Sequence, residues 1–144
     1  MNNNSCNGIK DILNVILVLQ QNVCPEDGLD TCDRPMLGGS GVCLSCNTRP
    51  VMLYTCCGNG VPWSMPVTKD ATTNCSGETV TDDCSTVFRV EKIDEDSVTF
   101  RVLAQNPDTT SLYPYVGTNS FFTMNCGCLC CIRCLSDTFV DNVC

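Results

Sequence analysis

Cysteines dominate the chemistry that this sequence could support. The chain has 144 residues, and 15 of them are cysteine. Such a density is typical of a disulfide scaffold, yet a domain of this length can bury a hydrophobic core without covalent help. The cysteines therefore exceed the number that folding requires. Their odd count also leaves at least one thiol free or bonded outside the chain.

Local spacing gives the C-terminal cysteines few ways to bond one another. Residues two apart on a strand lie roughly 6.5 Å apart with parallel Cβ vectors, and adjacent cysteines rarely bond each other. Both cases occur in the run Cys126-Gly127-Cys128-Leu129-Cys130-Cys131-Ile132-Arg133-Cys134. These thiols must therefore pair with other strands, with loops or with other molecules, which suits cross-linking.

The place of each cysteine in the chain predicts whether it bonds within or between subunits. Chain ends are mobile and exposed, so Cys6 and Cys144 are the first candidates for intermolecular disulfides. Further intermolecular candidates, from the two long loops, are Cys32, Cys56, Cys57, Cys75 and Cys84. The candidates for disulfides within the domain are Cys24, Cys43, Cys46, Cys126, Cys128, Cys130, Cys131 and Cys134. The alternative is that nearly all pairs are internal and that ordinary packing holds the subunits together.

Zinc ligation is the rival use of these thiols. Cys43-Leu44-Ser45-Cys46 and Cys131-Ile132-Arg133-Cys134 are two Cys-x-x-Cys pairs, the usual half-sites of a four-cysteine zinc site. They lie about 85 residues apart, which is too wide for a compact zinc ribbon or finger, and most cysteines would be left over. We therefore predict no cofactor and no metal, and keep a zinc-binding adaptor or binding module as the alternative function.

Composition disfavours several other classes of function. The chain has no histidine, which excludes Ser-His-Asp and Cys-His triads, and we predict that it is not an enzyme. Its formal net charge is −8, with scattered basic residues, so neither a nucleic-acid surface nor binding to an anionic membrane is predicted. The longest apolar stretch, residues 12–19, is far shorter than the roughly 20 residues that span a bilayer. The N-terminus also lacks the positive start of a secretory signal, so we expect cytoplasmic synthesis without membrane insertion.

Periodicity predicts one mainly β domain over residues 1–144. Residues 7–23 have apolar side chains at helical spacing, after a flexible N-terminal tail over 1–6. Their wide apolar surface fits a helix that packs on its own domain or one that packs on a neighbouring subunit. Strands are predicted over 49–55, over 87–91 and 98–104 as a hairpin with an acidic turn at 94–97, and over 121–134. The resulting fold is a single β-sandwich or small barrel with an N-terminal amphipathic helix, long cysteine-rich loops in a body over 24–135, and a C-terminal tail over 136–144.

Three segments, in the same order along the chain, are similar to segments of a known protein family. They are Asn47-Thr48-Arg49-Pro50 with Leu53-Tyr54-Thr55; Phe88-Arg89-Val90-Glu91 with Asp94, Asp96-Ser97 and Arg101-Val102-Leu103; and Cys128-Leu129-Cys130-Cys131-Ile132-Arg133-Cys134-Leu135. Together with the apolar helix, they resemble the CotY, CotZ and ExsY family of spore-coat and exosporium proteins of Bacillus and its relatives.

This resemblance implies a structural role. Such proteins are made in the cytoplasm of the sporulating mother cell and self-assemble on the spore surface, in the coat crust or the exosporium basal layer. The resemblance implies homo-oligomers, expected to be hexamers, packed in a hexagonal lattice with other coat or exosporium proteins and hardened by disulfides. It also implies that the thiols stay reduced during assembly and oxidise after the mother cell lyses.

Overall fold

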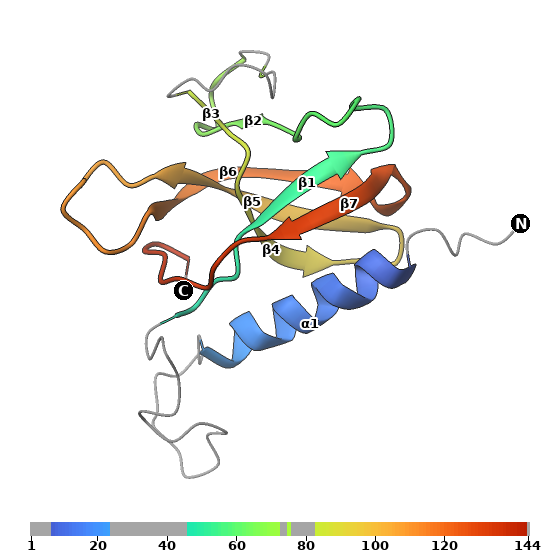
Figure 1. Ribbon diagram of the computed structural model, residues 1–144, viewed down its shortest axis with the longest axis horizontal. Coiled ribbons are helices and arrows are strands. Elements are labelled where there is room, and N and C mark those ends of the chain that lie inside the picture. The colour runs from blue at the N-terminus through green and yellow to red at the C-terminus, as the bar shows by residue number, and fades with distance from the viewer. Residues whose placement is uncertain (1–6, 24–45, 73–74, 76–82, 144) are drawn as a thin grey trace, which may run out of the picture.

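The computed structural model describes residues 7–23, 46–72, 75 and 83–143, and these form a mainly β domain with one N-terminal helix (Figure 1). This confirms the predicted class. The elements in chain order are α1 (Asn7–Val23), β1 (Val51–Thr55), β2 (Met65–Pro66), β3 (Cys84–Ser85), β4 (Phe88–Ile93), β5 (Ser97–Gln105), β6 (Tyr115–Asn125), the 3-10 helix η2 (Cys126–Cys128) and β7 (Leu129–Cys134).

The predicted helix is confirmed, and it packs along β4 and β7. Leu13 and Ile16 lie on its inner face and join the main hydrophobic core. Gln20, one turn further along, is also buried and bonds the helix to its surroundings. Its side-chain amide donates to the carbonyl oxygen of Val90 (2.8 Å) and accepts from the backbone N–H of Arg49 (3.2 Å). The helix is therefore held by apolar burial and by a satisfied buried amide.

The predicted hairpin is confirmed as β4 and β5, which pair antiparallel around the turn before Ser97. Alternation of apolar and polar residues places Phe88 opposite Val102 and Val90 opposite Phe100 on one face. Phe122 of β6 joins this face, with its ring centroid 4.8 Å from that of Phe88 and 5.4 Å from that of Phe100. Three aromatic rings thus form the centre of the core.

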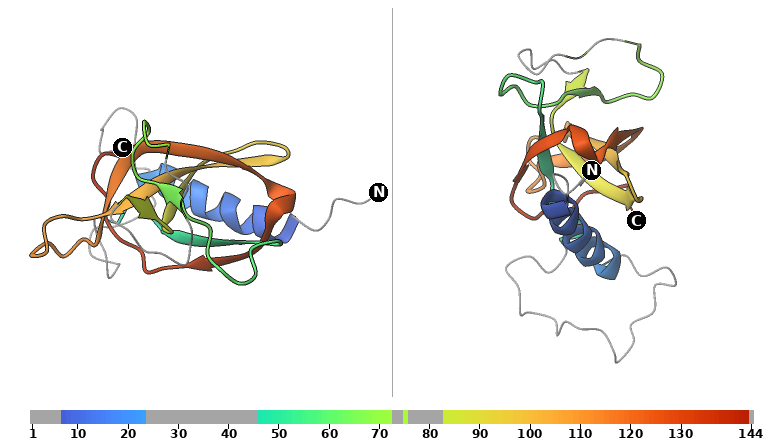
Figure 2. Two further views of the ribbon diagram at one scale, coloured as in Figure 1. Left: turned by 90° about the horizontal axis from the view of Figure 1, so that it is seen from above. Right: turned by 90° about the vertical axis from the view of Figure 1, so that its right-hand side faces the viewer.

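Five strands form one antiparallel sheet in the order β6-β5-β4-β1-β7, and this sheet is strongly curved (Figure 2). β6 and β7 are its opposite edges, yet only η2 joins them along the chain. A flat sheet would hold its outer strands about 19 Å apart, whereas the backbone from Asn125 to Leu129 spans at most about 14 Å. The sheet therefore coils towards a barrel. Among the described residues β6 and β7 do not pair, so of the two predicted architectures, a sandwich or a small barrel, the sheet does not form a closed barrel.

A small two-stranded sheet of β2 and β3 lies on the side of the large sheet away from α1 (Figures 1 and 2). Met65 and Val67 from this region pack against the same core as the helix. The hydroxyl of Ser120 on β6 donates to the carbonyl oxygen of Pro66 (2.8 Å). The core is thus covered by α1 at one end and by the small sheet at the other.

The predicted single strand over 121–134 is wrong. It is broken by η2, and the two halves, β6 and β7, lie at opposite edges of the sheet. Cys126 is buried, whereas Cys128 is exposed at the end of η2. The alternation that would have placed Cys126, Cys128 and Cys130 on one face is therefore lost, because a 3-10 turn does not preserve the period of two.

The segment predicted as a C-terminal tail packs on the domain over the described residues 136–143. Thr138 forms an isolated bridge with Thr48, and Val140 is buried with its N–H bonded to the side chain of Asn47 (2.9 Å). The backbone N–H of Gly117 donates to the carbonyl oxygen of Asp141 (3.0 Å). A Cβ atom at position 117 would lie only 2.7 Å from that oxygen, so this close approach requires glycine.

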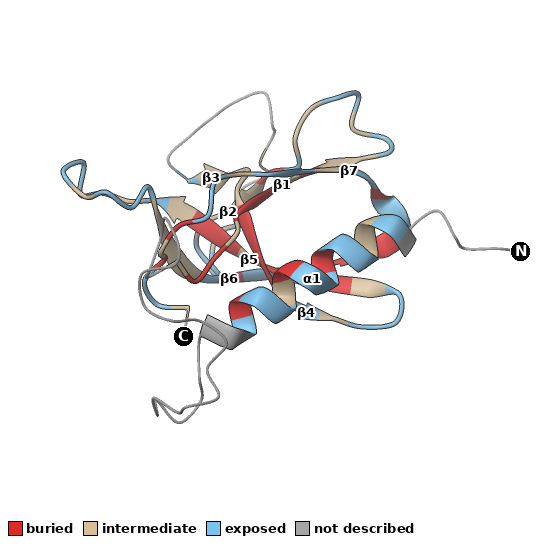
Figure 3. Cartoon of the chain, turned by 60° about the horizontal axis from the view of Figure 1, so that its bottom comes forward, coloured by how far each residue is buried: buried red, intermediate tan, exposed pale blue. Residues whose placement is uncertain are grey.

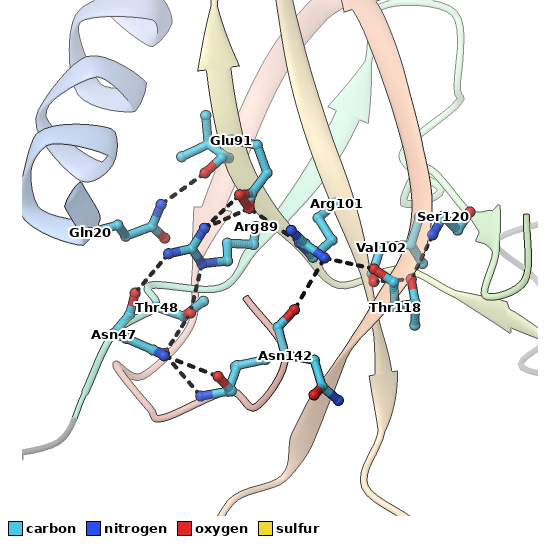
Figure 4. Close-up of polar contacts among 12 residues, drawn as sticks. Gln20, Asn47, Thr48, Arg89, Glu91, Arg101, Val102, Thr118, Ser120 and Asn142 are labelled. Carbon is cyan, nitrogen blue, oxygen red and sulfur yellow. Dashed lines mark hydrogen bonds and ion pairs between the residues drawn. The ribbon is translucent and has the colours of Figure 1, made fainter. Parts of the chain in front are cut away.

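A charged network under this segment joins it to the sheet (Figure 4). The carboxylate of Glu91 accepts from Arg89 (2.8 Å) and from Arg101 (3.3 Å). Arg89 also donates to the hydroxyl of Thr48 (2.9 Å), and Arg101 donates to the carbonyl oxygen of Asn142 (3.3 Å). One carboxylate thus neutralises part of the charge of two guanidinium groups, one bonded to Thr48 before β1 and the other to Asn142 after β7.

Asp137→Asn should lower the free energy of unfolding at pH 7 by less than about 1 kcal/mol. Asp137 forms a two-point ion pair with Arg49 (2.7 and 2.9 Å), and this hydrogen bonding holds the pKa of Asp137 below its usual value. Because the folded-state pKa is depressed, the contribution is present above the ordinary carboxyl pKa of about 3.9 and is lost as pH falls through the lower folded value. Both side chains are more than a third exposed, which keeps the effect small.

Urea unfolding of the wild type and this variant across an acid pH series measures the difference. The two stabilities should converge at low pH, where Asp137 is protonated, and should also approach each other in concentrated salt. A difference that stays constant from neutral to acid pH would contradict an ionic origin.

Candidate functional site

Four exposed, unbonded thiols lie along one side of the domain, at β7 and the segments next to it. Among the described residues, the unbonded cysteines are Cys57, Cys128, Cys131 and Cys134, and all four are exposed. Cys131 and Cys134 belong to β7, Cys128 ends η2 just before it, and Cys57 follows β1, the strand that pairs with β7. We call these four residues the thiol edge, because β7 is an edge strand of the five-stranded sheet.

For three members of the thiol edge, the structure corrects the prediction that they bond within the domain. Cys128, Cys131 and Cys134 were expected to bond within the domain, yet the structure leaves all three unbonded. The reason is the register between β1 and β7, which places Tyr54 opposite Cys131 and Val51 opposite Cys134. Because β7 has its neighbour on one side only, these thiols meet no cysteine across the strand. Cys57, expected to bond another subunit, is also exposed and unbonded.

Cys56 bonds within the chain, which corrects its assignment to intermolecular disulfides. Its partner is Cys130 on β7, 74 residues later, with the Cα atoms 5.1 Å apart. The pairing register shifts at Tyr54 and Thr55, so that Cys130 is the extra residue of a bulge in β7 beside the end of β1. The backbone N–H of Cys56 also donates to the carbonyl oxygen of Cys128 (3.1 Å), which aligns the two segments.

Cys75 and Cys84 are also bonded to each other, which corrects the intermolecular prediction for both. They are separated by nine residues, with Cα atoms 5.9 Å apart, within the range that a disulfide bridges. Cys84 lies on β3 opposite Pro66 of β2. The disulfide therefore fixes Cys75 to the first residue of β3.

The remaining predicted cysteines divide into two groups. Cys46 and Cys126 are disulfide-bonded. Cys6, Cys24, Cys32, Cys43 and Cys144 lie outside the described residues. Over the described ranges there is no group of three or more Cys, Asp or Glu side chains that could hold a metal ion. Nor does any helix in this part of the chain have the length and apolar character to span a bilayer.

The thiol edge carries basic side chains, although the whole chain is acidic. Arg133 lies on β7 between Cys131 and Cys134 in sequence and is exposed. The pKa of Arg49 is raised, first by its hydrogen bond to Asp137 and to a smaller extent by charge interaction with Asp137 and Cys134. No carboxylate lies on β7 itself. The charged side chain of β7 is therefore basic, unlike most of those on this acidic chain.

α1 exposes the face opposite the one that it buries (Figure 3), and several side chains on this outer face are apolar. Ile12, Val15, Val18 and Leu19 are 47 to 58% exposed, and Val15, Val18 and Leu19 line a shallow groove with Asn14. The inner face of α1 contributes Leu13 and Ile16 to the core, which confirms the interpretation that the helix packs on its own domain. The outer face has the composition of an interface, because contiguous exposed apolar patches on soluble domains mark interaction surfaces.

A hollow beside the small sheet offers little chemistry. Its volume is about 540 Å³, and it lies between the small sheet and β6. Its lining comprises Met65, Pro66, Thr68, Lys69, Ala71, Asn119, Ser120 and Phe121. A single lysine among hydroxyls and apolar groups does not form an acid–base pair or an activated nucleophile.

Sequence reasoning missed the thiol edge because it treated residues 121–134 as one strand. A signal for the break was present in Gly127, which lies between two cysteines in the middle of an otherwise extended run. It also missed the burial of Arg89, because this charged residue alternates with the apolar Phe88 and Val90 in the sequence. Comparisons with models of protein families, with curated proteins and with solved structures found no match for this chain.

Proposed function

We propose that this chain is a structural protein of the spore surface, which self-assembles into a two-dimensional layer that is then cross-linked by disulfides between subunits. The observation that carries the proposal is the thiol edge: four exposed thiols remain unbonded, while the other cysteines among the described residues are already in disulfides. A core of aliphatic and aromatic side chains supports the fold without these four thiols. They are therefore available for bonds to other molecules.

The chemistry of cross-linking is thiol–disulfide exchange. Two thiols from two chains lose two protons and two electrons as their sulfur–sulfur bond forms, and a low-molecular-weight disulfide accepts them and becomes two thiols. In a reducing cytoplasm the thiols stay free, and assembly by packing precedes covalent bonding. Exposed positions on an edge strand suit such late oxidation, because no rearrangement of the core is needed.

A layer needs at least two kinds of contact between subunits. Rings arise from heterologous contacts that close, and a second, isologous contact joins rings into a sheet. The outer face of α1 and the thiol edge are two separate surfaces that could provide these contacts. The resemblance to the CotY, CotZ and ExsY family supplies the setting: a homo-oligomer, expected to be a hexamer, in the coat crust or exosporium basal layer, together with other proteins of that layer.

The first experiment is electron microscopy of the purified full chain, with non-reducing electrophoresis before and after addition of glutathione disulfide. We expect ordered sheets, and covalent multimers that dithiothreitol returns to monomer. A variant with serine at Cys57, Cys128, Cys131 and Cys134 should form far fewer covalent multimers than the wild type.

Two outcomes would overturn the proposal. If the oxidised wild type runs only as monomer and shows no ordered assembly, a cross-linked layer is excluded. If protein purified without oxidant retains stoichiometric zinc through dialysis, the four-cysteine metal site is the better reading. Serine at Thr109, exposed in the turn between β5 and β6, serves as a control substitution that leaves every thiol and both proposed contact surfaces unchanged.

A further inference from the structure

No strand of the described ranges occupies the outer side of β7. Among the described residues β7 pairs with β1 alone. The backbone N–H of Leu135 donates to the carbonyl oxygen of Pro50 (2.8 Å), and this sets the phase of the antiparallel ladder. Because paired groups alternate along such a ladder, Arg133 and Cys131 point their backbone groups towards β1, whereas Ile132 and Cys134 point theirs outward. An edge with outward N–H and carbonyl groups is a template for strand addition.

The thiols of this edge have a symmetric spacing. Cys128 and Cys134 each lie three residues from Cys131, on either side. An antiparallel pair of identical strands is related by a two-fold axis, so the residue on the axis faces its own copy. With the axis at Cys131, the two copies of Cys131 face each other. The same register brings Cys128 level with Cys134 of the other copy.

We propose that two copies of this chain pair their β7 strands antiparallel about a two-fold axis at Cys131, and that a disulfide between the two Cys131 side chains closes the pair. This inference rests on the proposed function and names its covalent contact. Two thiols become one disulfide, and the two electrons and two protons pass to glutathione disulfide or an equivalent small disulfide.

The geometry favours this residue for the bond. Cys131 directs its backbone groups towards β1, so it occupies a non-hydrogen-bonded position in the new pair. Directly opposite residues at such positions have Cα atoms about 4.5 Å apart, within the range of roughly 4.4 to 6.8 Å that a disulfide bridges. Its thiol is exposed and unbonded, so the disulfide within the chain at Cys130 does not compete for it.

Other registers of the two β7 strands bring like charges together, bring no two free thiols together, or leave too little strand to pair. An axis at Arg133 would place two guanidinium groups directly opposite each other, and like charges at opposed positions destabilise a strand pair. An axis at Ile132 would put Cys131 opposite Arg133, with no pair of free thiols. An axis at Cys134 lies at the last residue of β7 and leaves almost no strand to pair. The axis at Cys131 pairs residues 129–133, which is as much of β7 as any of these axes pairs, and it places Arg133 opposite Leu129 of the other copy.

The test uses the full chain, reduced, diluted and then oxidised with glutathione disulfide, with cross-linked peptides mapped by mass spectrometry. Mixing isotope-labelled and unlabelled chains identifies bonds between chains. We expect a Cys131–Cys131 peptide as the main intermolecular product of the wild type and of Cys57→Ser, the matched control for an exposed thiol off the strand. Cys131→Ser should lose this dimer.

A second variant separates strand pairing from random collision of thiols. Ile132→Pro removes an outward-facing N–H, which an edge strand tolerates, but it blocks strand addition. Its Cys131 dimer should be much reduced although Cys131 is present, with far-ultraviolet circular dichroism confirming the fold.

Three results decide the matter. If Cys131→Ser forms as much dimer as the wild type, or if Cys131 bonds mainly to other cysteines, the two-fold pairing is wrong while cross-linking stands. If Ile132→Pro keeps its fold and dimerises fully, strand pairing is wrong. If the wild type forms no bond between chains at all, the proposed function fails together with it.

Discussion

Glu91→Gln should lower the free energy of unfolding by about 3 to 5 kcal/mol, because it leaves two guanidinium groups without their shared counter-charge. Arg89 and Arg101 both form ion pairs with this carboxylate. The side chain of Arg89 is only 6% exposed, so water cannot replace the lost anion. Glutamine still accepts a hydrogen bond but carries no charge. Urea unfolding at neutral pH under non-reducing conditions measures the change.

The matched control lies on the same hairpin. Asp94 forms an ion pair with Lys92 at 3.6 Å, and both side chains are at least half exposed. Asp94→Asn removes one negative charge in the same way but should cost less than about 1 kcal/mol, because solvent screens the pair. Equal losses in the two variants would show that the network at Glu91 contributes no more than a surface ion pair.

Loss of the disulfide between Cys56 and Cys130 should lower the free energy of unfolding by about 4.5 kcal/mol in a variant with alanine at both positions. The bond closes a loop with a sequence separation of 74, and it therefore restricts the unfolded chain strongly. It also fixes β7 against the end of β1, at the place where the pairing register shifts. Free thiols should be alkylated before unfolding, in the wild type as well, so that disulfides do not exchange.

The second disulfide provides the comparison. Cys75 and Cys84 are separated by only nine residues, so their replacement by alanine should cost about 2.5 kcal/mol. The expected difference of about 2 kcal/mol between the two variants follows from loop length alone. If the short-loop variant lost as much stability as the long-loop variant, loop closure would not be the main source of the stabilisation.

Local patterns were enough to predict the helix and the central hairpin. Leu13 and Ile16 recur at helical spacing, and Phe88 and Val90 alternate with charged residues, so a single buried face is visible in each segment. These patterns depend only on the geometry of the element itself. The mainly β class and the N-terminal helix followed from them.

The candidate site could not be predicted in the same way. Arg89 alternates with Phe88 and Val90, as an exposed strand residue would, yet it is buried, and its guanidinium donates to Thr48 and to the carbonyl oxygen of Asn47. Cys131 and Cys134 were expected to bond inside the domain, but their strand lies at an edge and faces Tyr54 and Val51. Both errors concern contacts between segments that lie far apart in the sequence.

By itself, the sequence determined that thiols outnumber what folding requires and which segments are helical or extended. Only the tertiary structure decided which thiols are bonded. A disulfide needs two Cα atoms within a few ångströms of each other, and for Cys56 and Cys130 the order of strands in the sheet sets that distance across 74 residues. The same order places β7 at an edge. That is why Cys131, one residue beyond Cys130, remains free to meet another chain.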